Sequence, residues 1–258
     1  MQATEGIEGV NRQQVAVITG GTKGIGRAVA YRLALDGCHV ILNYHGDDGA
    51  AQSALRDFKE LPVKAMAVKA DVATSDGASH LIEAAASEFG TVDVLVNNVG
   101  TFLIRPLSDT TDDEWRNTLD SNLSSVFYCS RAALRVMRDR RAGSIINIGA
   151  LNVEHSPIGV FEAPAYYIAK SGVIMLTRSL ARSEAPWGIR VNAVNPGFIE
   201  TENYDRYRTE DKATWTRMIP LGRLGAPDDV ANAVSFLTSE KAQYVTGTVL
   251  HVHGGLWV

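Results

Sequence analysis

The sequence has little cysteine and no long apolar run. Cys38 and Cys129 are its two cysteines among 258 residues, and both lie in apolar surroundings, so we expect reduced packing residues rather than a disulfide framework. No apolar stretch approaches the roughly 20 residues that a membrane-spanning helix needs. Residues 1–13 are polar and lack the apolar core of a signal peptide, so we expect a lead-in outside the fold. These absences predict a cytoplasmic protein with no membrane partner.

Positive charge is also in deficit. The net charge is -4 and the isoelectric point is near 5.9, so the basic surface that a nucleic-acid partner requires is not expected. Hydrophobic residues make up 45% of the chain and charged residues 21%, which is ordinary for a soluble globular protein. The length suits one α/β domain with an extensive core.

Apolar runs typical of strands alternate with helical patterns along the whole chain. We expect strands at 14–19, 40–43, 63–68, 93–96, 144–148, 189–194 and 248–252. Helices are expected at 24–35, 49–61, 75–89, 165–185 and 228–237, with two helices or one bent helix over 112–140. Short apolar strands joined by helical crossovers predict a parallel sheet covered on both faces. The pattern therefore predicts one doubly wound α/β domain over 14–258, with a less regular insertion at 198–218.

A glycine-rich turn separates the first strand from the first helix. Dinucleotide-binding proteins need glycine there for a sharp turn, for close approach of the backbone to pyrophosphate and for helix–strand packing. Free amides at the following helix N-terminus face the phosphates. The glycine spacing differs from Gly-x-Gly-x-x-Gly, and the alternative is a plain strand-to-helix turn. We predict cofactor binding by Thr19, Gly20, Thr22, Lys23, Gly24, Ile25 and Gly26.

Tyr166 and Lys170 are four residues apart in a predicted helix, so the phenol and the ammonium share one face. A cation within a few Å favours phenolate and lowers the pKa of tyrosine from about 10. Such a pair can exchange a proton with a substrate near neutral pH. The alternative is a packed aromatic ring beside a solvated lysine.

Several motifs occur in an order that resembles the short-chain dehydrogenase/reductase family. They are TGGTKGIG at 19–26, NNVG at 97–100, Asn122, YYIAK at 166–170 and NPG at 195–197. The resemblance runs from about Gln14 to the C-terminus. Segments 120–127, 222–225 and 250–255 are most similar to the branch that contains 3-oxoacyl-acyl-carrier-protein reductases. The resemblance implies a Rossmann-type domain with a mostly seven-stranded parallel sheet, and an oxidoreductase that reduces a carbonyl to a secondary alcohol with a nicotinamide cofactor.

The family also implies roles for individual residues. Tyr166 would donate a proton to the carbonyl oxygen, Lys170 would lower its pKa and bind the nicotinamide ribose, and Asn122 would support a water that connects the lysine to solvent. Asn97 is as suited to holding loops together as to contacting ligand. Further cofactor contacts are implied for Asn43, Tyr44, His45, Asp71, Val72, Asn98, Val99, Gly100, Pro196, Gly197, Ile199 and Thr201, together with Tyr166 and Lys170 themselves.

The residue after the second strand bears on the choice of nicotinamide. An acidic side chain there would repel a 2′-phosphate, and by resemblance that position is Tyr44. Lys23 adds a cation where the phosphate would lie. Both features predict a preference for NADP(H). Asp47 and Asp48 follow closely and oppose it, so NAD(H) stays as the alternative.

One catalytic position departs from the family. A serine that holds the substrate oxygen is usual just after the fifth strand, and Ala150 stands at that place. Ser156, Asn152 and His155 lie in the following loop as substitute donors, with Ser156 the first choice and a solvated loop serine its alternative. Three hypotheses follow: an active reductase with a substitute donor, a nucleotide-binding homologue with little or no turnover, or a structural subunit that binds no nucleotide.

The substrate is expected to lie between the loop 150–166 and a lid at 198–218. It is a small-molecule or acyl-carrier carbonyl compound. Carrier proteins are acidic, and a group of arginines at 135, 138, 140 and 141 would suit one, although cations also stabilise a helix C-terminus. Trp187 adds no charge at the next helix end. The family implies a homotetramer or homodimer that pairs through 112–140, 165–185 and the last strand. His251 and His253 share one side of that strand, and we expect packing and no metal.

Overall fold

The computed structural model describes residues 12–151, 153, 162–202 and 209–256. Its centre is a sheet of seven strands in the order β3-β2-β1-β4-β5-β6-β7, and every neighbouring pair is parallel. Because β1 lies between β2 and β4, the winding reverses there, and ligands of such sheets bind beside the carboxyl ends at this point. The strands are β1 (Val15–Ile18), β2 (His39–Tyr44), β3 (Ala65–Lys69), β4 (Val94–Asn97), β5 (Gly143–Ile148), β6 (Ile189–Pro196) and β7 (Val249–Val252).

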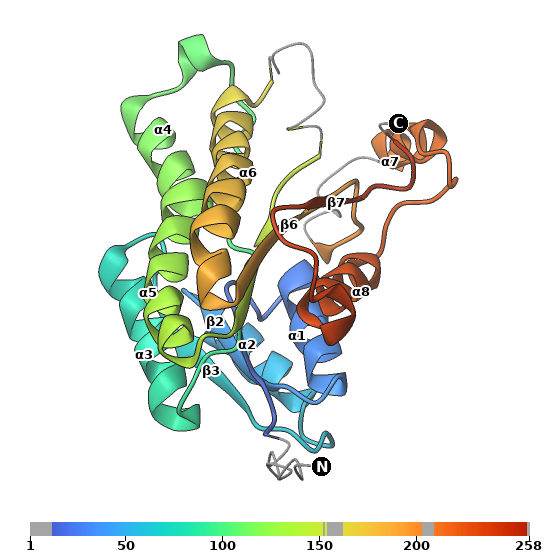
Figure 1. Cartoon of the computed structure of the whole chain (residues 1–258). Helices are drawn as coiled ribbons and strands as arrows, with labels where there is room; N and C mark the ends of the chain where they lie inside the picture. The colour runs from blue at the N-terminus through green and yellow to red at the C-terminus, as the bar shows by residue number, and fades with distance from the viewer. Residues whose placement is uncertain (1–11, 152, 154–161, 203–208, 257–258) are drawn as a thin grey trace, which may run out of the picture.

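Helices cover both faces of the sheet, as Figure 1 shows. Alternate strand residues point to opposite faces, so Ala16 and Ile18 join one hydrophobic cluster while Val15 and Val17 join the other. The first cluster includes α1 (Gly24–Leu35), α2 (Asp48–Arg56) and α8 (Pro227–Thr238). The second includes α3 (Ser75–Phe89), α5 (Ser125–Arg140) and α6 (Pro164–Glu184). The predicted doubly wound, seven-stranded Rossmann-type fold is therefore confirmed.

The run predicted as two helices or one bent helix is continuous and changes its winding in the middle. It consists of α4 (Asp112–Leu119), a π-helical turn η2 (Asp120–Ser124) and α5. The run begins with a capping box, in which Thr111 and Glu114 each accept a hydrogen bond from the other's backbone amide. A π turn inserts an extra residue into a helix and is frequent at functional sites. Here it carries Asn122.

Two expectations on helices were wrong. The helix expected over 49–61 ends at Arg56, and the next residue, Asp57, accepts two hydrogen bonds from Arg27 of α1, at 2.7 and 2.9 Å. The insertion at 198–218 contains a regular helix, α7 (Thr209–Met218), which Figure 1 shows apart from the sheet. Short helical turns η1 (Leu107–Asp109), η3 (Ala185–Trp187) and η5 (Glu240–Ala242) complete the described elements.

Both cysteines are buried and free, as expected. Burial raises the pKa of Cys38 to about 11 and that of Cys129 to about 12, so neither thiol is ionised near neutral pH. Among the described residues, no helix is long and apolar enough to span a membrane.

Candidate active site

The glycine turn is fastened to the end of β4. The Thr19 hydroxyl accepts hydrogen bonds from the backbone amides of Asn98 (2.8 Å) and Val99 (3.1 Å), and the Asn98 side chain donates to the Thr19 carbonyl at 3.0 Å. Gly20 has a φ of +60°. A Cβ on Gly26 would lie 2.2 Å from the Gly20 carbonyl oxygen, so the turn closes this tightly only with glycine.

The N-terminus of α1 is open toward a ligand. Its N-cap residue, Lys23, makes no side-chain cap, and no acidic residue lies in the first turn. The amides of this turn and the positive end of the helix dipole therefore suit an anion such as a pyrophosphate. The tight backbone and the uncapped helix together fit the phosphate-binding role that the sequence predicted for residues 19–26.

Charged pairs surround the expected position of the adenosine ribose. Lys23 is paired with Asp47, and Lys69 with Asp48 at 3.1 Å. The Lys23 ammonium and the Ala50 amide lower the pKa of Asp47. The Tyr44 hydroxyl hydrogen-bonds to Asp48, which raises the pKa of Tyr44. The cation that the sequence offers to a 2′-phosphate is therefore already held by a carboxylate.

The other predicted cofactor residues gather at the same edge of the sheet. Asn43 is buried at the end of β2, accepts a hydrogen bond from the Gly20 amide at 3.3 Å and donates to the Ala70 carbonyl at 2.9 Å, so it braces the glycine turn. Asn97 donates to Ser130 and Asn147, at 3.1 and 2.8 Å, which favours the structural role. The remainder lie at or just beyond strand ends: Tyr44 at the end of β2 and His45 after it, Asp71 and Val72 after β3, Asn98, Val99 and Gly100 after β4, and Pro196, Gly197, Ile199 and Thr201 at or after the end of β6.

Lys170 is buried beneath Tyr166. Its ammonium donates to the Ile148 carbonyl at 2.8 Å and lies 5.9 Å from the centre of the Tyr166 ring. Burial lowers the pKa of Lys170 to about 8. Burial in apolar surroundings, with a smaller effect of Tyr167, raises the pKa of the Tyr166 phenol. The lowering of the tyrosine pKa expected from the sequence is therefore not found, because burial of the phenol raises its pKa.

Asn122 and Lys170 face one small space. The Asn122 side-chain amide donates to the Thr101 and Thr118 carbonyls, at 2.9 and 3.0 Å, while its Oδ1 has no partner. A Cβ on Gly100 would lie 2.4 Å from that oxygen and 3.3 Å from the Lys170 Nζ. The sequence predicted that these two side chains belong to one site, and the structure brings them together around Gly100.

Gly149, the residue before Ala150, has a polar neighbour that the sequence analysis named only within the Asn-Pro-Gly motif. Ala150 is buried, and Ser156, Asn152 and His155 lie outside the described residues. Asn195, at the end of β6, is fully buried, and neither polar atom of its amide has a partner among the described residues. A Cβ on Gly149 would lie 2.0 Å from its Oδ1. The available signal was a polar residue ending an apolar strand, beside Pro196.

Aromatic rings flank the proposed proton donor. The edge of Phe102 meets Tyr166 at a centroid distance of 4.8 Å and an angle of 84°, and Tyr167 meets it at 5.4 Å and 83°. Phe198, just after β6, stacks on Trp215 of α7 at 5.1 Å and 17°. α7 is thus packed on the segment that follows the Asn-Pro-Gly motif. Phe102 was not anticipated, because nothing in its local pattern points to Tyr166.

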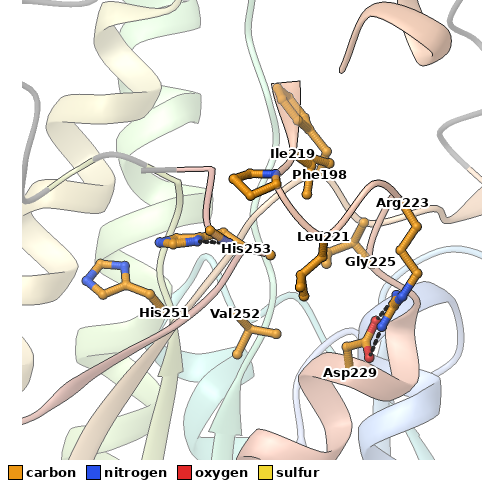
Figure 2. Close-up of a pocket in the computed structure, with 13 residues that line it drawn as sticks. Phe198, Ile219, Leu221, Arg223, Gly225, Asp229, His251, Val252 and His253 are labelled. Atoms are coloured by element: carbon orange, nitrogen blue, oxygen red, sulfur yellow. Dashed lines mark hydrogen bonds and ion pairs between the residues drawn. The ribbon is translucent and has the colours of Figure 1, made fainter. Parts of the chain in front are cut away.

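A separate cavity of about 500 Å³ lies between the segment after β6 and the end of β7 (Figure 2). Neither Tyr166 nor Lys170 lines it. The rings of His251 and His253 lie 5.4 Å apart at one side, and the ion pair of Arg223 and Asp229, at 2.7 Å, lies at the other. The described residues contain no group of three or more metal-binding side chains.

The arginines near the end of α5 have local partners. Arg138 makes two hydrogen bonds of 2.7 Å to Glu184, and Arg140 lies 3.9 Å from Asp93. Arg141 donates to the Pro186 carbonyl at 2.7 Å. The guanidinium groups of Arg138 and Arg141 lie 5.7 and 5.3 Å from the centre of the Trp187 ring. The contacts of Arg138 and Arg141 join the end of α5 to the end of α6 and to η3, and Arg140 faces Asp93 just before β4.

Comparisons with known proteins agree with the geometry. A family model described as enoyl-(acyl carrier protein) reductase matches residues 20–257. The chain is 40% identical over 246 residues to the 3-oxoacyl-acyl-carrier-protein reductase FabG of Staphylococcus aureus, covering 94% of this chain and 98% of that protein. Against FabG of Escherichia coli the identity is 39%, covering 95% and 98%. A solved short-chain dehydrogenase/reductase double mutant from Serratia marcescens superposes with a TM-score of 0.87 at 33% identity, covering 95% of this chain and 98% of that one.

Proposed function

The chain belongs to the short-chain dehydrogenase/reductase family of oxidoreductases, and from this premise we propose that it reduces a carbonyl compound to a secondary alcohol with NADP(H). The observation that carries the proposal is the position of Tyr166 over the buried Lys170, at the sheet edge where the glycine turn opens. A bound nicotinamide would supply the hydride. The glycine turn and the α1 N-terminus fit its pyrophosphate, because the backbone is tight and the helix end is uncapped.

We assign the proton path to three side chains. Tyr166 donates its proton to the substrate oxygen as negative charge develops there. Lys170 stabilises the resulting phenolate, and its lowered pKa lets it exchange a proton near neutral pH. The Asn122 Oδ1, which faces Lys170 across Gly100, holds the water through which the proton is replaced. Burial raises the pKa of the Tyr166 phenol, so the transfer depends on the stabilisation of the phenolate by Lys170.

The preference for NADP(H) rests on Lys23 and on the absence of an acidic residue at Tyr44. Since Lys23 is held by Asp47, we propose that a 2′-phosphate exchanges with the carboxylate as the partner of the ammonium. The family members named FabG are 3-oxoacyl-acyl-carrier-protein reductases, and we propose a 3-oxoacyl thioester as substrate, in a cytoplasmic homotetramer or homodimer. A carrier-linked thioester that turns over no better than its free analogue would count against carrier recognition. Light scattering of the purified protein measures the assembly.

The test is reduction of a small 3-oxo ester, followed by oxidation of NADPH. We expect Tyr166→Phe to lower kcat by about 10³-fold, because the proton donor is lost while the ring and its packing stay. The matched control is Tyr167→Phe, which removes the neighbouring hydroxyl and should retain activity within about threefold. Equal losses in the two variants would contradict the assignment.

Ala150 has no hydroxyl to hold the substrate oxygen, and this favours a second candidate function, that of a nucleotide-binding homologue with little turnover. Losing one hydrogen-bond donor to a developing oxyanion costs about 10²–10³ in rate. If another donor replaces the missing hydroxyl, Ala150→Ser should change kcat less than about tenfold. A gain of 10² or more, from a wild type that binds NADPH and barely turns over, would support the second function.

A further inference from the structure

Three consecutive apolar residues, the first of which contacts the proposed proton donor, lie outside the hydrophobic core. Phe102, Leu103 and Ile104 follow the Asn-Asn-Val-Gly motif, and we call them the Phe102 platform. Phe102 is 50% exposed and Ile104 is 57% exposed, and neither hydrophobic cluster contains any of the three. Contiguous exposed apolar side chains mark a binding surface more often than isolated ones do. The exposure of the platform therefore indicates a binding surface.

The platform is held firmly at both ends. Before it, the Thr101 carbonyl accepts a hydrogen bond of 2.9 Å from Asn122, and the Thr101 hydroxyl lies 2.7 Å from that of Ser121. After it, Arg105 forms an ion pair of 3.0 Å with Glu114 of α4. Its exposure is thus built into the fold, and its position is tied to Asn122.

The platform also borders the reacting group. The Phe102 ring meets Tyr166 edge-on at 4.8 Å, so a compound whose carbonyl oxygen reaches the phenol has its neighbouring atoms close to Phe102. The one charged side chain directly after the platform, Arg105, is occupied by Glu114. The segment offers contact area to an apolar group and no charge to a polar one.

We propose that the Phe102 platform binds the apolar chain of the substrate and selects carbonyl compounds by the length of that chain. This inference rests on the proposed carbonyl reduction and adds the substrate class: free carbonyl compounds that carry an aliphatic chain. It makes Phe102 a specificity residue, because its ring touches the substrate next to the reacting oxygen.

The experiment measures kcat/KM for free 3-oxoacyl N-acetylcysteamine thioesters of four, six, eight and ten carbons. Full burial of a methylene group corresponds to about a fourfold gain, so we expect about twofold per methylene on a surface that leaves one side open. Phe102→Ala should abolish most of this rise, so that its loss of kcat/KM relative to wild type grows from the four-carbon to the ten-carbon substrate. The control is Leu35→Ala, which removes an apolar side chain of similar exposure (53%) at the far end of α1 and should leave the rise unchanged.

Three results would overturn the inference. One is an unchanged chain-length dependence in Phe102→Ala. Another is an equal loss for all four substrates with a shifted pH profile of kcat, because the ring would then only position Tyr166. The third is a lower molecular mass of Phe102→Ala than of the wild type by light scattering, because the platform would then be a contact between copies of the chain.

Binding of the chain by the platform can be tested even if the protein does not reduce these substrates. If the wild type binds NADPH and reduces none of the four substrates, the chain-length series is repeated as dissociation constants of the 3-hydroxyacyl thioesters, read from NADPH fluorescence. Affinity that rises with chain length in wild type and not in Phe102→Ala supports the platform without catalysis. Affinity independent of chain length in both would overturn it.

Discussion

The nucleotide half of the site, around the glycine turn, differs from the substrate half, around Tyr166 and Lys170, in whether its buried polar atoms have hydrogen-bond partners. In the nucleotide half, Thr19 and Asn98 bond to each other's backbone, and Asn43 accepts from the Gly20 amide. None of these three residues is among the described ones with a buried side-chain atom that lacks a partner. Seven such atoms occur among the described residues, and four of them belong to Asn97, Asn122 and Asn195, near the substrate half. A buried polar atom without a partner costs about 1–3 kcal/mol. The polar groups of the nucleotide half are thus paired within the protein, whereas the substrate half keeps buried polar atoms without partners, including the Asn122 Oδ1 of the proposed proton path.

The largest effect should come from a substitution in the nucleotide half. In Gly26→Ala the new Cβ would lie 2.2 Å from the Gly20 carbonyl oxygen and 2.6 Å from the Asn98 amide nitrogen. Overpacking of this kind costs about 1–3 kcal/mol or more, and the turn that faces the pyrophosphate is distorted with it. We expect a lower Tm and at least a 100-fold loss of NADPH affinity by fluorescence titration. Gly49→Ala is the control, since its Cβ meets only an ordinary contact of 3.5 Å; equal losses in both would refute the argument.

A substitution in the substrate half should raise the stability of the fold instead of lowering it. Lys170→Met removes a buried charge, so we expect kcat to fall about 10²-fold while the free energy of unfolding at pH 7 rises by up to about 3 kcal/mol. Because burial lowers the lysine pKa to about 8, the folded protein holds fewer protons than the unfolded chain between pH 8 and 10.5. Wild-type stability therefore rises with pH through this window, and the advantage of the variant shrinks.

Urea unfolding at pH 7 and pH 9.5 measures the difference between the two proteins. A gap that stays constant with pH would show that Lys170 carries no buried charge. Lys64→Met, a change at an exposed lysine, controls for the substitution itself and should leave the free energy of unfolding nearly unchanged at both pH values.

The smallest effect is expected at the adenosine end, where the charges are exposed. Asp47→Asn frees Lys23, so NADPH should gain about three- to tenfold in kcat/KM over NADH, and added salt should reduce the gain. Asp48→Asn is the matched control, because Asp48 is paired with Lys69 instead. A wild type that already prefers NADH, with no shift in Asp47→Asn, would reverse the cofactor assignment.

Much of the fold could be predicted because it depends on local pattern. The periodicity placed all seven strands and gave the bounds of the helix Gly24–Leu35 and of Ser75–Phe89 as observed. Elements that depend on distant partners were less accessible. β6 continues to Pro196 because Asn195 and Pro196 pair with His251 and Val252 of β7. The helix after β2 stops early at Asp57, whose carboxylate is held by Arg27.

The site divides in the same way. Tyr166 and Lys170 could be found from their spacing, and the glycine turn from its place between a strand and a helix. Three other features could not be found in this way, because each is a contact between segments that are distant in sequence. They are the ion pair of Lys23 with Asp47, the ring contact of Phe102 with Tyr166 and the approach of the buried Asn195 amide to Gly149. The raised pKa of Tyr166 arises from the burial that those segments create, which no single motif contains.

The π-helical turn at Asp120–Ser124 fixes the phase of the long helical run. Each residue of an α-helix turns the chain by about 100°, so one residue removed here would rotate everything that follows by that angle. Cys129, Ala133 and Met137 of α5, all buried against the sheet, would then face away from it, or α4 would turn out of its own place. A single-residue deletion in this turn is therefore incompatible with keeping both Asn122 and the packed face of α5, even though the shortened sequence would be a more regular helix.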